Sequence, residues 1–400
     1  MTGLRAAFAL VCCLGLAAMP RLARATITDG LIFYVPFENF TPQDIIGGKS
    51  GSAGGAPAAG SGGIIGNFVH LTNDTVLPET YLYWEDPTPA TNNFSVQVWL
   101  RSTSLQNGQA SVDPPIIGNK NWGSGVNPGW VVALGSSTGT LGRLQWNFRA
   151  PPATRADFDP TAANTTVQDG AWHHLIVTHD RNGLATFYVD GVDVGAVSIA
   201  GGAGNSVLPA VPGIFALAND MTLNYENGNG TTANGDFDEL AMWNRVLFPG
   251  EITRIYNAGR SGTNVLNVPE PTTPFVLDAL PIDGTPDYSP EGIFRAVILD
   301  ASTQLNPGSV KVFLDGTQVT NALQGASGTN VITFGPPTLL GPQSTHEYRL
   351  EFSDNGSPAV ARTNRYSFVV ANYSNLLLPP PIVLETFNVV PEAGLPAGCQ

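Results

Sequence analysis

Cysteine is scarce in this sequence. The 400 residues include three cysteines, and two of them, Cys12 and Cys13, lie in an apolar stretch at the N-terminus. If that stretch is removed as a leader, only Cys399 remains, and no internal disulfide can form. The absence excludes a small disulfide-stapled scaffold, so the fold must be stabilised by burial of apolar surface, assisted by a bound metal if one is present.

Long apolar runs are also lacking. The one candidate, Ala6–Met19, follows Arg5 and is too short and too poorly flanked for a membrane span. Ala23 and Ala25 offer small residues at the two positions that a signal peptidase reads. We therefore expect residues 1–25 to be a signal peptide, and the mature protein to be secreted or held at the cell surface, with no membrane span.

Basic residues are few. The chain has 18 Lys and Arg against 32 Asp and Glu, a net charge of −14, and loss of Arg5, Arg21 and Arg24 with the leader would make it −17. Binding of nucleic acid depends on Lys and Arg, so this composition excludes it as a partner. An acidic chain is better suited to cations and to neutral glycans.

Glycine and proline are abundant, in contrast. There are 45 Gly and 32 Pro, whereas charged residues make up only 12% of the sequence. Together with many β-branched and aromatic residues, this composition favours many short strands joined by turns over long helices. The sequence therefore predicts an all-β protein, and its length allows two domains.

The segment Gly235–Ile252 changes from the period of a strand to the period of a helix. From Asp236 to Trp243, apolar residues occupy both alternating sets of positions, as in a strand covered on both faces. Ile252, Ile255 and Tyr256 then follow at helical spacing, with Pro249 suited to a first helical position and Gly259 able to end the helix. The segment predicts a closing strand followed by a short helix that caps a sheet.

This segment resembles the closing motif of bacterial laminin G-like (LamG) domains, which are concanavalin A-like jelly rolls. The matching string is G-x-x-D-E-x-x-x-W-N-R-x-L-x-x-x-E-I. Three earlier segments are similar to that family in the expected order: Leu31–Glu38, Phe94–Arg101 and Trp172–Gly191. The resemblance implies a jelly roll over residues 26–263. One departure is Phe248, where such domains usually place Ser or Thr, so the helix lacks a side-chain cap worth about 1 kcal/mol.

The chain divides near residue 264. All seven Trp lie between Trp84 and Trp243, and residues 264–274 read as a proline-bearing linker. Residues 275–372 contain four predicted strands and resemble a smaller immunoglobulin-like or fibronectin type III-like β-sandwich. Residues 373–400 form a tail that resembles the start of a further β-domain, which suggests that the chain is truncated there.

The sequence predicts no catalytic residues. Laminarinase-type glucanases, which share the concanavalin A-like fold, carry Glu-x-Asp-x-Glu on one strand, so that alternate positions place the carboxylates on one face. The nearest match here is Asp236-x-Asp238-x-Leu240, and Glu239 points to the opposite face of a regular strand. Without two facing carboxylates, glycoside hydrolysis lacks its acid/base pair, unless a β-bulge or an acid from elsewhere in the chain supplies it.

Oxygen-rich loops suggest a structural calcium ion. Asp220 and the segment that follows it lead into Asp236 and Asp238, and similar jelly rolls often hold calcium near the closing strand with help from the opening strand, which brings in Glu38. We expect these four carboxylates to supply ligands. An equally open alternative is a solvated polar loop whose Asp side chains bind local backbone.

Aromatic residues in predicted loops are candidates for sugar stacking. Trp84, Trp122, Trp130 and Tyr225 lie in or beside such loops, with Asn121 close to Trp122 in sequence. Sugar rings stack on aromatic faces, and amides bind hydroxyl groups. These five residues form the expected ligand site, whereas we assign Trp99, Trp146, Trp172 and Trp243 to the core.

Two classes of function fit these observations. The first is a secreted or cell-surface recognition module that binds a glycan or an extracellular protein through its LamG-like domain. The alternative is a polysaccharide-degrading glycoside hydrolase or a non-catalytic fragment of one. A structural surface module without a small ligand is the simplest third possibility. The sequence names neither a particular ligand nor an oligomeric state.

Overall fold

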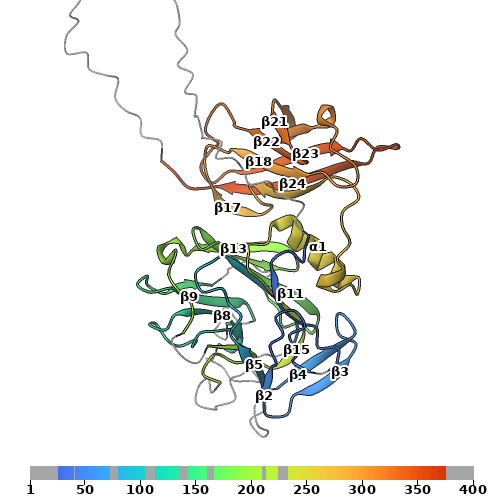
Figure 1. Ribbon diagram of the computed structural model, residues 1–400. Helices are drawn as coiled ribbons and strands as arrows, with labels where there is room; N and C mark the ends of the chain where they lie inside the picture. Colours follow the sequence, from blue (N-terminus) through green and yellow to red (C-terminus); the bar gives the residue numbers. More distant parts are fainter. Residues whose placement is uncertain are drawn as a thin grey trace, which may run out of the picture.

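The computed structural model describes residues 26–39, 41–72, 80–103, 113–135, 142–159, 166–209, 213–223 and 233–374. Within these ranges the chain is built almost entirely of antiparallel strands, arranged as a jelly-roll sandwich followed by a second β domain (Figure 1). The all-β expectation is confirmed. No helix in the described ranges is long and apolar enough to cross a membrane.

The first domain consists of two facing sheets. Over the described residues, one has eight strands in the order β13-β12-β11-β6-β15-β4-β3, with β1 also paired to β15, and the other has seven in the order β10-β9-β8-β7-β14-β5-β2. The first sheet contains β1 (Leu31–Val35), β3 (Ala58–Ser61), β4 (Asn67–Leu71), β6 (Phe94–Arg101), β11 (Trp172–His179), β12 (Leu184–Val189), β13 (Val192–Ser198) and β15 (Gly235–Trp243). The second contains β2 (Ser52–Gly54), β5 (Tyr81–Glu85), β7 (Pro115–Gly118), β8 (Gly129–Leu134), β9 (Leu144–Arg149), β10 (Ala156–Phe158) and β14 (Ile214–Leu217).

The closing segment folds as its periodicity predicts. β15 pairs with both β1 and β6 near the middle of the eight-stranded sheet, and α1 (Pro249–Arg260) follows it. Phe237, Leu240 and Met242 enter the main core between the sheets, whereas Trp243 joins a smaller cluster under α1. β15 is therefore covered on both faces, which explains its run of apolar residues.

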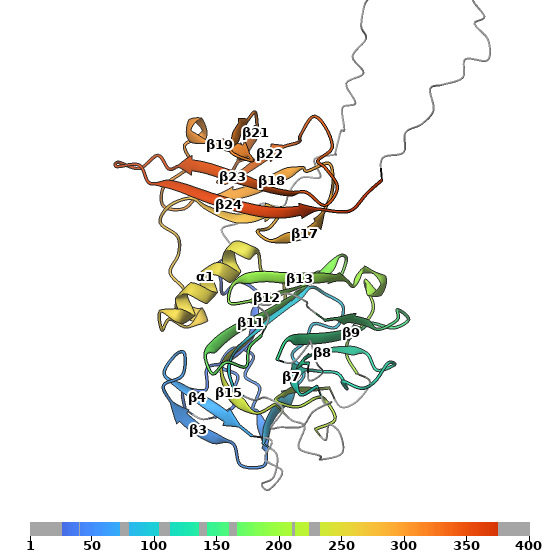
Figure 2. The same cartoon turned by 180° about the vertical axis from the view of Figure 1, so that it is seen from behind.

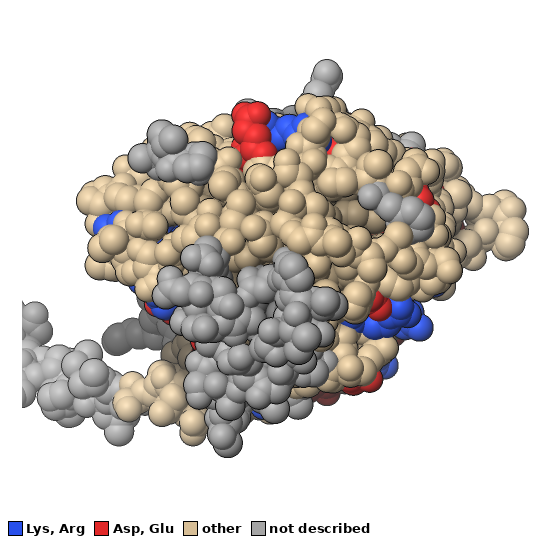
Figure 3. Space-filling view, turned by 90° about the horizontal axis from the view of Figure 1, so that it is seen from below, with Lys and Arg blue, Asp and Glu red and all other residues tan. Residues whose placement is uncertain are grey.

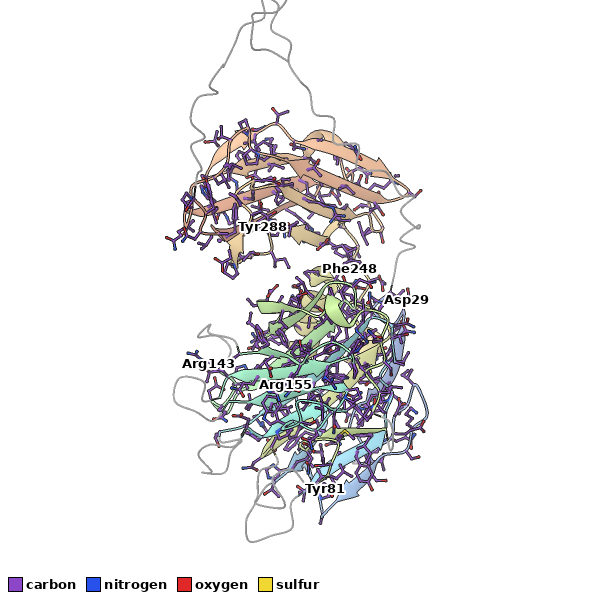
Figure 4. The ribbon with its side chains drawn as sticks, turned by 90° about the vertical axis from the view of Figure 1, so that its left-hand side faces the viewer. Asp29, Tyr81, Arg143, Arg155, Phe248 and Tyr288 are labelled. Carbon is purple, nitrogen blue, oxygen red and sulfur yellow. The ribbon has the colours of Figure 1, made fainter. Side chains whose placement is uncertain are left out.

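The N-terminus of α1 is held without a side-chain cap from Phe248. The carboxylate of Glu251, which is buried, accepts the backbone N–H of Phe248 at 2.9 Å and pairs with the Arg245 guanidinium at 2.7 and 2.8 Å. Phe248 itself packs against Leu277 and its apolar neighbours in the second domain. The apolar residue that departs from the family motif thus lies at the junction of the two domains (Figure 4).

The second domain also has two sheets. In the described chain these are a four-stranded sheet in the order β16-β18-β22-β21 and a five-stranded sheet in the order β17-β24-β23-β19-β20. The first contains β16 (Phe275–Leu280), β18 (Phe294–Leu299), β21 (Ala322–Ala326) and β22 (Thr329–Phe334). The second contains β17 (Thr285–Tyr288), β19 (Lys311–Leu314), β20 (Thr317–Val319), β23 (Thr345–Ser353) and β24 (Ala361–Val370). Short 3-10 turns occur at η2 (Ala200–Gly202), η4 (Val265–Asn267) and η5 (Pro307–Ser309).

The second domain rests on α1. A Cβ added to Gly250, in the first turn of α1, would lie 2.4 Å from the Val276 carbonyl oxygen, so helix and strand β16 are in close contact. Figures 1 and 2 show α1 and β13 on the side of the first domain that faces the second.

Tyr373 packs against the core of the second domain and donates a hydrogen bond to the Leu340 carbonyl at 2.6 Å.

Candidate functional site

A β-bulge in β15 rearranges the acidic residues of the closing strand. Asp238 pairs with Trp99 and Ala241 pairs with Gln97, so Glu239 and Leu240 together oppose the single residue Val98. Glu239 has a φ of 52°, which is unusual for a residue with a side chain. Asp238 and Glu239 consequently lie on the same outer face of the sheet, and the expectation that Glu239 points to the opposite face is wrong.

Both carboxyl groups are buried. Asp238 has no exposed surface and accepts hydrogen bonds from the backbone N–H of Ile65 at 3.1 Å and of Glu239 at 2.9 Å. Glu239 Oε2 accepts the Tyr34 hydroxyl at 2.7 Å, and the backbone N–H of Val265 also donates toward this carboxyl group. Neither group is placed where a polysaccharide could reach it.

Burial is the main cause of a high pKa at both groups. It raises the pKa of Asp238 to about 9, with the charges of Glu239 and Glu38 adding to the effect. Burial likewise raises the pKa of Glu239 to about 8, although the Tyr34 hydrogen bond opposes the shift. In the absence of a cation, the two side chains are therefore protonated at neutral pH.

Glu38 approaches the same turn as Asp238. At the turn between β3 and β4, the backbone N–H of Asn67 donates to Glu38 Oε2 at 3.2 Å. The backbone N–H of Ile65, in the same turn, donates to Asp238. A Cβ at Gly63 would lie 2.5 Å from Asp238 Oδ2, and one at Gly66 would lie 2.2 Å from Glu38 Oε2. Glycine is required at both positions because the turn closes tightly over the two carboxylates.

The four predicted calcium ligands do not form one cluster. Asp236, two residues before Asp238 on β15, pairs with Arg101 at 2.8 Å and with His70 at 2.7 Å. Asp220 follows β14 of the other sheet, where it accepts the backbone N–H groups of Trp122 and Thr222. Over the described ranges, no group of three His, Cys, Asp or Glu side chains is arranged to hold a metal. Of the four, only Asp238 and Glu38 meet at one turn, where backbone N–H groups donate to both.

Two predicted ligand-binding tryptophans belong to the core. Trp130 is fully buried and its indole N–H bonds Thr88 Oγ1 at 3.2 Å, while Trp84 is 1% exposed and its indole N–H bonds the Pro42 carbonyl at 2.6 Å. Both rings face the space between the sheets because they occupy inward positions on β8 and β5. Their assignment to a ligand site is wrong. Tyr225 lies outside the described residues.

Trp122 and Asn121 lie in a loop whose backbone is held by hydrogen bonds from several elements. We call residues 121–127, between β7 and β8, the Trp122 loop. The backbone of Trp122 donates to Asp220 Oδ2 at 3.0 Å, and its carbonyl accepts from Asn147 Nδ2 at 3.1 Å and from Arg155 Nη1 at 3.5 Å. Trp122 and Asn121 are both partly exposed. A fixed backbone thus presents an aromatic and an amide side chain at the surface.

Lysine and arginine complete the clamp. The ammonium group of Lys120 donates to the carbonyls of Asn121 at 2.8 Å and Ser124 at 2.6 Å, and Arg149 donates to the Val126 carbonyl. Sequence reasoning missed these residues because β9 and β10 meet the loop only after folding. The one usable signal was Lys120, a lysine next to the candidate residues Asn121 and Trp122 in a chain with few basic residues.

Comparison with protein families supports the resemblance of the first domain. Residues 77–253 match the family model Laminin_G_3, described as the concanavalin A-like lectin/glucanases superfamily. The matched range runs from just before β5 into α1 and so includes both the Trp122 loop and the closing strand. It supports a concanavalin A-like lectin/glucanase domain in this part of the chain. A search of curated proteins found no match.

Several solved structures resemble the chain at a distance. Domain 4 of AbnA, a GH43 extracellular arabinanase from Geobacillus stearothermophilus, in complex with arabinotriose, is 19% identical over 56% of this chain and 96% of that chain, with a TM-score of 0.41. The binding domain of Paraclostridial Mosquitocidal Protein 1 is 12% identical over 82% and 78%, with a TM-score of 0.47. The binding domain of botulinum neurotoxin serotype D/C is 13% identical over 86% and 74%, with a TM-score of 0.43. At these values no functional conclusion follows.

Proposed function

We propose that this protein is a secreted or cell-surface recognition module without catalytic activity. Its first domain binds carbohydrate, or a glycan-bearing surface protein, through the Trp122 loop. The observation that carries this proposal is the clamped backbone that holds a partly exposed indole beside the Asn121 amide. Such a site loses little conformational entropy on binding, because its loop is already ordered.

The second domain acts as a spacer in this proposal. Its two sheets enclose a core of their own, in the manner of an immunoglobulin-like sandwich. It contacts the first domain at α1, on a different element from the Trp122 loop. The spacer therefore leaves the proposed binding loop free to meet a ligand.

The position of the β15 carboxylates argues against hydrolysis by this strand. Glycosidases need two carboxyl groups that flank the scissile bond. Asp238 and Glu239 are buried, and Asp236 is held by Arg101 and His70. These residues support a role in stability instead.

A structural calcium ion is the second part of the proposal. Asp238 and Glu38 would hold it beside the β3–β4 turn, and the neighbouring Glu239 carboxyl group would add negative charge. A bound Ca²⁺ would supply positive charge that lets Asp238 and Glu239 ionise. It would tie the opening strand, the β3–β4 turn and the closing strand together.

A glycan array tests the binding proposal. The full chain without its leader is applied to immobilised plant, algal and bacterial oligosaccharides, in parallel with W122A and W122F. We expect W122A to weaken binding at least tenfold, about 1.4 kcal/mol, and W122F to retain most of it because an aromatic face remains. Equal thermal unfolding of the three proteins is the folding control. Unchanged binding by W122A, or no glycan bound by any of them, would contradict the proposal.

A further inference from the structure

Three cationic side chains converge on the Trp122 loop. Lys120 bonds the carbonyls of Asn121 and Ser124, Arg149 at the end of β9 bonds the Val126 carbonyl, and Arg155 before β10 approaches the Trp122 carbonyl. They come from three different elements of the seven-stranded sheet. The fold therefore gathers positive charge at one loop of an otherwise acidic protein.

Two of these charges lack a carboxylate partner. Among the described residues, Arg155 forms an ion pair with Asp157 at 2.6 Å, whereas Lys120 and Arg149 contact only carbonyl oxygens. The nearby Asp220 carboxylate is already engaged by N–H groups and by the Thr222 hydroxyl. Elsewhere in the described chain most arginines pair with an acid, as Arg101 and Arg245 do.

The ionisation of Lys120 reflects the same positive field. Burial is the main cause that lowers the pKa of Lys120 to about 8; the charges of Arg155 and Arg149 add to this shift, and those of Asp157 and Asp220 oppose it. A buried ammonium group without a counter-ion is unfavourable. An anion that arrives with a ligand would relieve this repulsion.

We infer that the Trp122 loop selects acidic glycans, in which a carboxylate or sulfate on the sugar pairs with Arg149 in the positive field of Lys120. This inference rests on the proposed function and adds its ligand class. Arg149 is partly exposed and uses only one of its five N–H donors within the described chain. The guanidinium plane matches the two oxygens of a carboxylate or sulfate. The sugar that bears the anion would stack on Trp122.

The test uses oligosaccharide pairs that differ only in charge. Oligomers of galacturonate, glucuronate and mannuronate are compared with their methyl esters, and a sulfated galactan is compared with its desulfated form. The uronate and sulfate arms distinguish the two sources of negative charge. We expect the full chain to bind one charged member at least tenfold more tightly than its neutral partner, and to lose most of that preference in 0.5 M NaCl through screening.

R149Q is the decisive variant and R143Q is its matched control. Arg143 precedes β9 whereas Arg149 ends it, so the two lie about 20 Å apart along the strand. We expect R149Q to abolish the preference for the charged member and R143Q to retain it.

The outcomes separate the two proposals. Equal binding of charged and neutral members that is lost in W122A would overturn the acidic-glycan inference and leave the proposed function standing. A charge preference that survives in R149Q would also overturn the inference. No binding of any pair member, at low or high salt, would count against the proposed function itself.

Discussion

Glu239 shows how one inserted residue changes the chemistry of a strand. In a regular strand, Asp238 and Glu239 would face opposite sides, but the bulge places both on the outer face beside Tyr34. Ionising both of two neighbouring buried carboxyl groups is unfavourable, because burial and mutual repulsion both disfavour the charged forms. The strand motif therefore yields a protonated pair rather than an accessible acid and base.

Asp238 and Glu239 make the free energy of unfolding depend on pH. The unfolded chain releases these two protons near pH 4, while the folded protein keeps them up to about pH 8 for Glu239 and pH 9 for Asp238. The folded state binds more protons between those values, so the free energy of unfolding without calcium falls as pH rises through this window. We expect E239Q to flatten the fall and to gain about 1–3 kcal/mol at pH 8.

Urea unfolding in EDTA at pH 5, 7 and 8.5 measures this effect. E85Q is the control, because Glu85 is exposed on β5. If the free energy of unfolding falls equally steeply with pH in wild type and in E239Q, Glu239 is ionised in the folded protein and the expectation is wrong.

At the scale of elements, the β3–β4 turn joins strands that are distant in sequence. It contacts Glu38 after β1 and Asp238 in β15 through backbone N–H groups and two glycines that admit no side chain. The sequence predicted the two carboxylates because both lie beside recognisable strands. It did not predict the turn, since a glycine-rich segment carries no signal of which strand it will meet.

Calcium should therefore act on this junction with a dependence on pH. Calcium competes with the proton on Asp238, so we expect a rise in melting temperature of several degrees at pH 8.5 in 5 mM CaCl₂, and a smaller rise at pH 6. D238N should remove the response while E85Q keeps it. Calorimetric titration of the protein with CaCl₂, in buffers of different ionisation enthalpy, should detect the protons that the protein releases when calcium binds. Identical melting curves in EDTA and in calcium would contradict the calcium proposal.

The Trp122 loop marks the limit of prediction at this scale. Residues 94–101 and 249–260 follow from periodicity and motif, because each element carries its own pattern. The loop is ordered by Lys120, Asn147 and Arg155, which come together only through sheet pairing. Trp84 and Trp130 were misassigned because a tryptophan at the edge of a predicted strand does not show which face it occupies.

At the scale of the whole molecule, the net charge of −14 conceals the basic Trp122 loop. Acidic composition alone pointed to cations and neutral glycans, whereas the fold gathers three of the few basic side chains at one place. Seen from below, most of the described surface carries neither Lys, Arg, Asp nor Glu, and the atoms of these charged residues lie mainly toward the edge of the outline (Figure 3). Local placement of charge thus decides the expected ligand class.

Phe248 couples the two domains. It stands at the helix N-cap, where Ser would add a side-chain hydrogen bond, yet it packs on the second domain beside Leu277. We expect F248S to strengthen the cap by about 1 kcal/mol while loosening the junction. Cleavage within residues 264–274 by a low dose of protease should become at least several-fold faster, and small-angle scattering should show a larger radius of gyration.

F248L is the matched control, because it keeps an apolar contact without adding a cap. We expect its cleavage rate and radius to stay near those of the wild type. If F248S matches wild type in both measurements, the junction does not depend on this side chain.

The central claim is that the first domain recognises a glycan without cleaving it. The most direct measurement incubates the full chain with its best array ligand and follows binding by calorimetry and new reducing ends over a day. We expect saturable binding, weakened at least tenfold in W122A, with no reducing ends above a protein-free blank. Reducing ends that form in proportion to protein concentration and disappear in D238N would contradict it and identify a glycoside hydrolase.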